Sequence, residues 1–219
     1  MTVPGRHGWV RVAPGTVPRL LAGADPRDAD EVLAWLALGR PFVVRARRDG
    51  EAGDRWPLAL SRRRPQPGVA FSVGAAQVLD GSPPLPLRAA IDAMPVAWRS
   101  AAGALDAALR EAGIEAGVFG SAAWSVIAGE ARMRPDSDLD VVVPVGDRAT
   151  LEAALARLAA AQAAAPGRID AECVWPDGRA AHWRELAFTY LTHATLKKRR
   201  LNLATGITHN SNGYSFVVQ

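Results

Sequence analysis

The chain has 219 residues, of which 49% are hydrophobic and 22% are charged. This length and composition are ordinary for a globular protein with a substantial core, and they exclude wholesale disorder and a collagen-like repeat. No run reaches the roughly 18 apolar residues of a membrane span, because the most apolar long stretch, residues 151–165, contains Glu152, Arg157 and Gln162. We therefore expect no membrane partner.

The cysteine content and the first residues both favour a cytoplasmic protein. Cys173 is the single cysteine, which excludes an internal disulfide and a cysteine-rich zinc site. Residues 1–12 carry Arg6, His7 and Arg11 but no apolar segment, so they do not resemble a secretory signal.

The excess of positive charge lies in one short cluster. The chain has 26 basic and 22 acidic residues, a formal net charge of +4. Four of the basic residues, at positions 197–200, follow the last acidic residue, Glu185, so residues 1–185 are neutral. The basic isoelectric point is thus no evidence that the folded body binds nucleic acid, and we expect no nucleic-acid partner.

Residues 188–219 also differ from the rest of the chain in composition. Both lysines, both tyrosines and all the asparagines lie after residue 188, whereas every tryptophan lies before residue 184. So abrupt a change predicts an anomalous tail of non-native origin, which we leave out of the functional interpretation. A genuine basic carboxy-terminal segment is the alternative.

The first elements in chain order predict an amino-terminal β-rich module over residues 1–82. A short strand at residues 9–12 precedes a helix that Asp25 and Pro26 begin and Gly39 ends. The apolar stripe of this helix is formed by Val32, Leu33, Leu36 and Leu38. Strands are predicted at residues 42–47, 56–61 and 68–73, and the proline-rich residues 79–87 are predicted to be a linker.

Helices and strands then alternate over residues 96–186, which predicts a catalytic domain of the α/β or α+β class. We place this domain at residues 88–187 and expect an α+β fold for the chain. Helices are expected at residues 96–112, 122–129 and 151–165. Strands are expected at residues 117–119, 138–145 and 169–175.

Two aspartates mark the strand at residues 138–145 as chemically important. Side chains alternate along a strand, so Asp138 and Asp140 point to one face, and Val141 and Val143 point to the other, towards a core. Two neighbouring carboxylates repel each other unless a positive charge lies between them. Mg²⁺ is the natural partner, because it prefers carboxylate and phosphate oxygens.

The preceding turn offers a phosphate site. Gly120 permits close approach of the backbone, and Ser121 begins a helix whose free N–H groups favour an anion. A later strand adds Asp170 and Glu172, of which Asp170 is the better candidate for a third carboxylate. Three acids can hold two metal ions for displacement at phosphorus.

Each signal is weak by itself. An Asp-x-Asp pair is more often a solvated strand end, and Asp138 has an alternative ion-pair partner in Arg134. Together, in this order and spacing, the signals make residues 96–186 resemble the nucleotidyltransferase superfamily of the DNA polymerase β type. The resemblance implies a mixed sheet with flanking helices.

The resemblance narrows to the phosphoribosyl-dephospho-CoA transferases of malonate decarboxylase and covers about residues 5–186. The motifs that carry it are at residues 120–124, 137–140, 168–172, 176–179 and 183–185, with Arg6 and His7 near the start. Gly8 stands where an acidic residue is expected after that pair, which puts a role for His7 in question. From about Ala187 the sequence leaves the family pattern.

This resemblance implies a reaction. A serine of the acyl-carrier subunit attacks the α-phosphorus of triphosphoribosyl-dephospho-CoA, and pyrophosphate leaves. Asp138 and Asp140 would hold Mg²⁺ on the triphosphate, and Asp170 would complete a second metal site and help to deprotonate the serine. The phosphates would be bound by Gly120, Ser121, Arg132 and Arg134, although a solvated loop is an equal alternative for the two arginines.

Two other functions remain open. One is a nucleotidyltransferase that modifies an antibiotic, an RNA or a protein hydroxyl. The other is a scaffold that only binds the carrier or its prosthetic precursor. Clustered aspartates argue against a pure scaffold, because mutually repelling acids give a binder no advantage.

Overall fold

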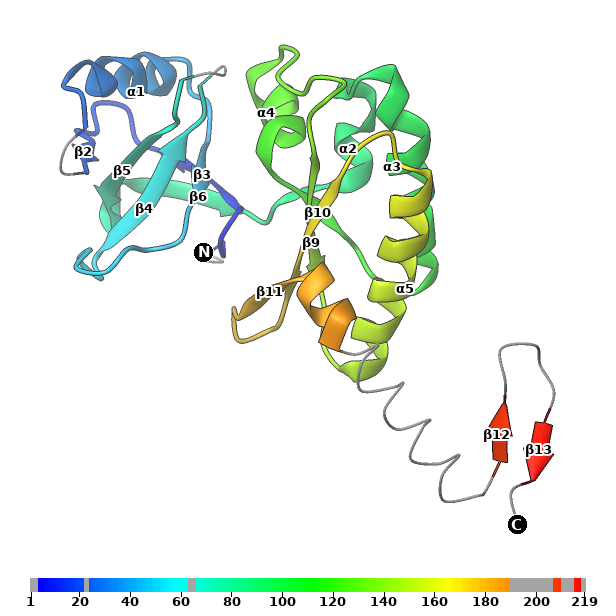
Figure 1. Cartoon of the computed structure of the whole chain (residues 1–219). Helices are drawn as coiled ribbons and strands as arrows, with labels where there is room; N and C mark the ends of the chain where they lie inside the picture. The colour runs from blue at the N-terminus through cyan, green and yellow to red at the C-terminus, as the bar shows by residue number, and fades with distance from the viewer. Residues whose placement is uncertain (1–3, 22–23, 63–65, 190–206, 210–214, 218–219) are drawn as a thin grey trace.

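The computed structural model describes residues 4–21, 24–62, 66–189, 207–209 and 215–217 (Figure 1). The described part has an α+β fold, as predicted, built on two main sheets. A separate pair of strands, β12 (Ile207–His209) and β13 (Ser215–Val217), lies in the segment that we predicted to be anomalous. Among the described helices, none combines the length and apolarity that spanning a bilayer requires.

The first sheet contains six strands in the order β2-β5-β4-β3-β1-β6, all antiparallel to their neighbours. Helix α1 (Arg27–Ala37) belongs to this half, and Gly39 follows its C-cap with a positive φ of 65° that suits a glycine. The strands are β1 (Trp9–Val12), β2 (Arg19–Leu20), β3 (Phe42–Val44), β4 (Arg55–Leu60), β5 (Val69–Gly74) and β6 (Val78–Ser82).

The second sheet has five strands in the order β11-β10-β9-β8-β7. It is mixed, as predicted, because β9 and β10 are parallel and the other pairs are antiparallel. Its strands are β7 (Leu85–Pro86), β8 (Gly117–Val118), β9 (Leu139–Pro144), β10 (Ile169–Val174) and β11 (Ala180–His182). Its helices are α2 (Leu87–Ala90), α3 (Val96–Glu111), α4 (Gly120–Ala128), α5 (Arg148–Ala164) and the helical residues 183–189.

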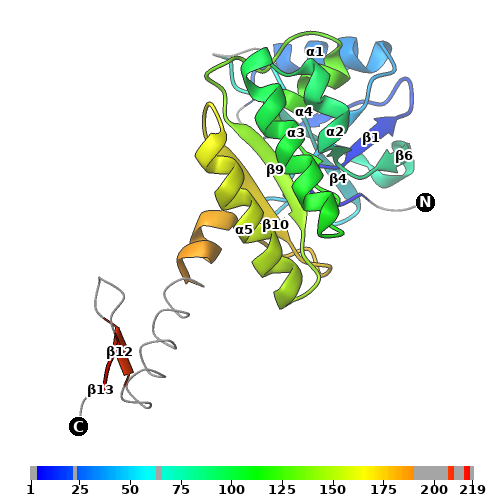
Figure 2. The same cartoon turned by 90° about the vertical axis from the view of Figure 1, so that its right-hand side faces the viewer.

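Helices α3 and α5 cover one face of the second sheet (Figure 2). Residues 139, 141 and 143 of β9 and residues 169, 171 and 173 of β10 are fully buried. The acidic residues between them, Asp140, Asp170 and Glu172, are only partly buried. Alternation along the strands thus leaves the carboxylates on the opposite face, which looks towards the amino-terminal half (Figure 1).

The prediction of a linker at residues 79–87 is wrong. Residues 78–82 form β6 and residues 85–86 form β7, and each strand lies at an edge of its sheet. Proline lacks an N–H donor, but an edge strand is paired on one side only and tolerates it. The prolines at positions 83, 84 and 86 therefore allow this passage from one sheet to the other.

The predicted stripe of α1 is only half correct. Val32 and Leu36 are buried, but Leu33 is 42% exposed and Leu38 is 63% exposed. The third buried residue is Trp35, whose indole N–H donates to the Pro41 carbonyl oxygen at 3.0 Å. A large ring with a satisfied donor displaces the smaller leucines from the core.

Three tryptophans join the two halves. Trp124 of α4 packs edge-on against Trp9 of β1, with ring centroids 5.0 Å apart, and against Trp35 of α1 at 5.7 Å. All three are at most 8% exposed. The apolar core is therefore continuous between the two sheets.

A part-buried ion pair links the strands of the first sheet and predicts acid sensitivity. Arg45 binds the Glu51 carboxylate and also donates to the carbonyl oxygens of Leu58 and Phe71. Hydrogen bonding to Arg45 lowers the pKa of Glu51 to about 2. The unfolded chain takes up this proton at a higher pH than the folded chain. The stabilisation is thus complete above about pH 5 and is lost as the pH falls towards 2.

We therefore expect Glu51→Gln to destabilise the protein at pH 7 and the difference from wild type to shrink in acid. Urea unfolding of both proteins between pH 3 and pH 7 measures this difference. A difference that stays constant across the range would contradict the role given to the pair.

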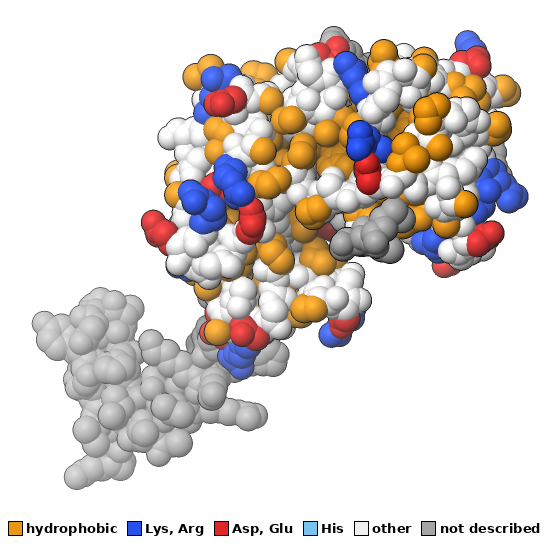
Figure 3. Space-filling model, turned by 180° about the vertical axis from the view of Figure 1, so that it is seen from behind, with side chains coloured by type: hydrophobic (Ala, Val, Ile, Leu, Met, Phe, Trp, Pro, Cys, Tyr) orange, Lys and Arg blue, Asp and Glu red, His pale blue; other side chains and the backbone are white. Residues whose placement is uncertain are grey.

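On the face shown in Figure 3, Arg side chains lie beside Asp and Glu side chains. The ion pairs of this kind include Arg88 with Glu115 and Arg148 with Glu152. The positive charges of these arginines are therefore balanced locally, which agrees with the neutral composition of residues 1–185.

Candidate functional site

Gly120 places the start of α4 directly on the Asp140 side chain. A Cβ atom at Gly120 would lie 1.8 Å from Asp140 Oδ2, and the φ of 59° is one that other residues rarely adopt. The Phe119 N–H donates to the Asp140 carbonyl oxygen at 3.1 Å. The predicted turn and the predicted carboxylate are therefore in contact.

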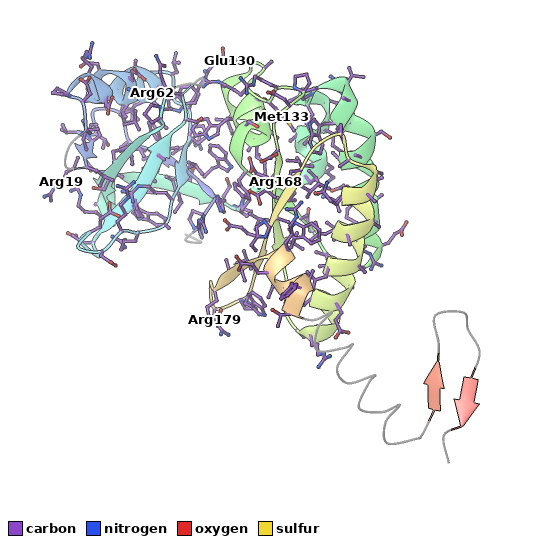
Figure 4. All side chains as sticks on the ribbon, in the orientation of Figure 1. Arg19, Arg62, Glu130, Met133, Arg168 and Arg179 are labelled. Atoms are coloured by element: carbon purple, nitrogen blue, oxygen red, sulfur yellow. The ribbon has the colours of Figure 1, made fainter. Side chains whose placement is uncertain are left out.

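The structure brings the three predicted aspartates to one face of the sheet. Asp140 and Asp170 are paired in register on the parallel strands β9 and β10. Arg168 lies directly before β10 (Figure 4) and contacts the carboxylates of Asp138 and Asp170. Its Nη2 is 2.8 Å from Asp138 Oδ2 and 3.5 Å from Asp170 Oδ2. Arg168 thus supplies the positive charge that neighbouring carboxylates require.

His182 of β11 supports Asp170 from the other side. The backbone N–H of Arg184 donates to His182 Nδ1 at 3.2 Å, so the ring proton is assigned to Nε2. This Nε2–H donates to Asp170 Oδ1 at 2.5 Å. The histidine therefore orients the carboxylate, in the way that an outer histidine–carboxylate pair fixes a reactive group.

Glu172, two residues along β10, is bound by the amino-terminal segment. Arg6 contacts both of its carboxylate oxygens at 2.9 Å, and His7 Nε2–H donates to Oε2 at 3.1 Å. Burial raises the pKa of Glu172, but the hydrogen bond from His7 and the charges of His7 and Arg6 outweigh burial and lower it overall. Glu172 is thus kept ionised and bound to Arg6 and His7, whereas Asp170 lies beside the other aspartates.

The donor set suits a magnesium ion held partly by substrate. Among the described residues, no three His, Cys, Asp or Glu side chains are grouped as a ready metal site. Mg²⁺ commonly takes only one or two carboxylates and completes its shell with phosphate oxygens and water. The in-register carboxylates of Asp140 and Asp170 fit that requirement, and a magnesium site here remains a prediction.

Comparison with known proteins identifies the family. Residues 86–204 match the family model described as the phosphoribosyl-dephospho-CoA transferase MdcG C-terminal domain. A phosphoribosyl-dephospho-CoA transferase of Xanthomonas campestris pv. campestris (strain 8004) is 32% identical over 192 residues, which cover 84% of this chain and 85% of the relative. The chain belongs to the phosphoribosyl-dephospho-CoA transferase family.

A second relative gives the same result. A phosphoribosyl-dephospho-CoA transferase of Bradyrhizobium diazoefficiens is 31% identical over 185 residues, which cover 84% of this chain and 82% of the relative. The family match continues to residue 204 and so covers the first part of the segment 188–219. No solved structure matches the chain significantly.

The other predicted phosphate ligands are placed differently from the aspartates. Ser121 is the second residue of α4 and is partly exposed, close to the cluster through its neighbour Gly120. Arg132 pairs with Glu130 at 2.7 Å and donates to the Ser61 carbonyl oxygen at 3.3 Å. Arg134 pairs with Asp136 at 3.2 Å. The partners described for the two arginines are thus not the aspartates of the site. Phosphate binding by these arginines stays a prediction.

Arg132 instead lines a pocket of about 370 Å³ between the halves, together with Trp35 and Arg62. Arg62 and Glu130 are labelled at this end of the molecule in Figure 4. Arg62 is itself paired with Asp28 and Glu31 of α1, both at 2.6 Å. The pocket is thus lined by apolar and charged side chains, and its arginines form ion pairs with nearby acids.

Several residues of the site have no role predicted from the sequence. Glu172 is there only a weaker candidate than Asp170, and Arg168, which directly precedes β10, appears only within a family motif. Arg6 and His7 likewise appear only as part of the family pattern, and nothing local predicts their contact with Glu172, because 166 residues separate Arg6 from it. Despite the departure from the family pattern at Gly8, His7 lies beside the site.

Proposed function

We propose that this protein transfers the phosphoribosyl-dephospho-CoA group from triphosphoribosyl-dephospho-CoA to a serine of the acyl-carrier subunit of malonate decarboxylase and releases pyrophosphate. As a member of its family the protein is a transferase. The observation that carries the finer proposal is the contact between the Gly120 turn and Asp140, with Asp170 in register beside it. This arrangement combines an anion-binding helix start with carboxylates suited to a metal-bound polyphosphate.

The turn at the start of α4 and the aspartates have different tasks in this reaction. Gly120 and Ser121 present the backbone N–H groups at the start of α4 to the phosphates. Asp138, Asp140 and Asp170 would hold Mg²⁺, which when bound neutralises charge on the phosphates and on the leaving pyrophosphate. The bond formed joins the serine oxygen to the α-phosphorus, and the bond broken joins that phosphorus to the pyrophosphate oxygen.

Asp170 accepts the proton that the attacking serine loses. Its carboxylate is partly exposed, so a hydroxyl from outside can reach it. His182 fixes its orientation from the side of β11 through a hydrogen bond to Oδ1. Oriented general-base catalysis of this kind contributes roughly 10²–10⁴-fold to a rate.

A labelled-donor experiment tests this function against its rivals. The protein is mixed with Mg²⁺ and the apo carrier subunit, and receives either labelled triphosphoribosyl-dephospho-CoA or labelled ATP. We expect label in the carrier from the first donor only. Efficient incorporation from ATP would instead indicate a general nucleotidyltransferase, and carrier binding without incorporation from either donor would indicate a scaffold.

A further inference from the structure

Arg6 and His7 belong to the amino-terminal half, yet they bind the strand that carries Asp170. Arg6 pairs with Glu172 of β10 through both guanidinium nitrogens, and His7 donates to the same carboxylate. The side chains of His7 and Glu172 are only 12% and 19% exposed, so the hydrogen bond between them is shielded from solvent, whereas the Arg6 side chain is 49% exposed. Arg6 and His7 therefore border the site on the side of Glu172.

The same histidine contacts the catalytic turn. The His7 ring stacks on the Phe119 ring with centroids 3.9 Å apart and an angle of 25° between the planes. Phe119 precedes Gly120 and donates its backbone N–H to the Asp140 carbonyl oxygen. His7 thus touches Glu172 on one side and, on the other, the residue that leads into the phosphate-binding turn.

The backbone of His7 is strained to reach this position. Among the described residues it is the non-glycine residue with a positive φ, at 68°. The loop is held in place because the His7 N–H donates to the Val44 carbonyl oxygen and the Val44 N–H donates to the Gly8 carbonyl oxygen, each at 2.8 Å. Strain of this kind persists where the surroundings enforce it, and it concentrates at functional sites.

A purely structural role explains these features poorly. The tryptophan cluster of residues 9, 35 and 124 already joins the two halves with apolar contacts. The ion pair of Arg6 with Glu172 is open to solvent on the arginine side, and such a pair adds little net stability, because water screens its attraction and two long side chains lose conformational freedom. A strained histidine would then reduce stability without a compensating gain.

We propose that Arg6, His7 and Glu172 form a latch, with His7 as the positioning residue that holds the turn at residues 119–121 against Asp140. This inference rests on the proposed function for its catalytic consequence, but the latch itself is a statement about the free protein. It assigns to the amino-terminal half a part in transfer, namely keeping the phosphate-binding turn in place. It also explains why Glu172 binds Arg6 and His7, although it shares a face of β10 with Asp170.

The decisive variant is His7→Asn, because asparagine tolerates a positive φ but cannot stack on Phe119 as imidazole does. We expect kcat for transfer to fall by about 10–100-fold, the range for residues that orient a reactive group. The KM for triphosphoribosyl-dephospho-CoA and the thermal unfolding midpoint should change little. Hydrogen exchange of the Phe119 amide, measured by NMR without substrate, should become faster.

Two further variants separate positioning from folding. His7→Gly relieves the backbone strain, so we expect an unchanged or higher unfolding midpoint together with the same loss of kcat. Arg11→Gln is the matched control, because Arg11 forms an exposed ion pair with Asp80 in the same half. It should alter neither kcat nor the exchange of the Phe119 amide.

These measurements test the latch and the proposed function separately. Unchanged kcat and unchanged exchange of the Phe119 amide in His7→Asn would overturn the latch. A parallel loss of kcat and unfolding midpoint in His7→Gly would reduce His7 to a folding residue and also overturn it. If wild-type protein transfers nothing to the carrier, the proposed function fails, and the exchange measurement still decides whether the latch exists.

Discussion

Asp140→Asn is expected to reduce transfer to the carrier by at least about a thousandfold, and Asp138→Asn by a similar factor. Asp140 lies against the Gly120 turn and in register with Asp170, so its negative charge is at the centre of the site. An amide keeps the shape but removes the charge that a divalent cation requires. Loss of metal-assisted charge stabilisation costs several kcal/mol, and about 1.4 kcal/mol corresponds to each factor of ten.

Asp136→Asn is the matched control for these variants. Asp136 is 73% exposed and pairs with Arg134 in the loop before β9. It should transfer at nearly the wild-type rate. Single-turnover rates at saturating Mg²⁺ measure the effect, and retained binding of the carrier by Asp140→Asn would show that only chemistry is lost. Unchanged transfer by both Asp138→Asn and Asp140→Asn would remove the mechanism.

Gly120→Ala is expected to damage both folding and activity. The new methyl group would lie 1.8 Å from Asp140 Oδ2, at a φ that alanine adopts only with strain. Either the turn or the carboxylate must move, and each movement separates the phosphate-binding N–H groups from the aspartates. We expect a loss of about 3 kcal/mol or more in the free energy of unfolding, and a loss of activity in whatever protein folds.

Gly129→Ala isolates the steric part of this effect. Gly129 ends the same helix with a similar φ of 65°, but no atom lies within 4 Å of a Cβ built there. It should therefore cost only the conformational strain, roughly 1–2 kcal/mol, and leave transfer nearly intact. Denaturant unfolding and transfer assays on both variants make the comparison. Equal losses at the two glycines would show that the contact with Asp140 is unimportant.

Local patterns in the sequence were sufficient to predict the elements that carry the aspartates. Alternation along residues 139–143 and 169–173 placed the acids opposite the buried residues, and the structure agrees. The helices predicted at residues 96–112 and 122–129 end close to where expected, at glycines 113 and 129, which both have a positive φ. The contact between Gly120 and Asp140 comes from the structure, in which β8 and β9 are neighbours in the sheet.

What the sequence did not predict depends on distant pairing. Residues 79–82 carry too few apolar side chains to indicate a strand, and only pairing with β1 makes them one. The attachment of Arg6 and His7 to Glu172 requires the two halves to pack, which the tryptophans at positions 9, 35 and 124 achieve. A charged residue near the start of a chain gives no local sign of such a partner.

The mass of the carrier subunit after reaction tests the central claim most directly. Apo carrier is incubated with the protein, triphosphoribosyl-dephospho-CoA and Mg²⁺, and the intact carrier is analysed by mass spectrometry. The account predicts a gain equal to one phosphoribosyl-dephospho-CoA group attached to a serine, and no gain with Asp140→Asn. A carrier that stays unmodified with wild-type protein, or that gains the same mass with Asp140→Asn, would contradict it.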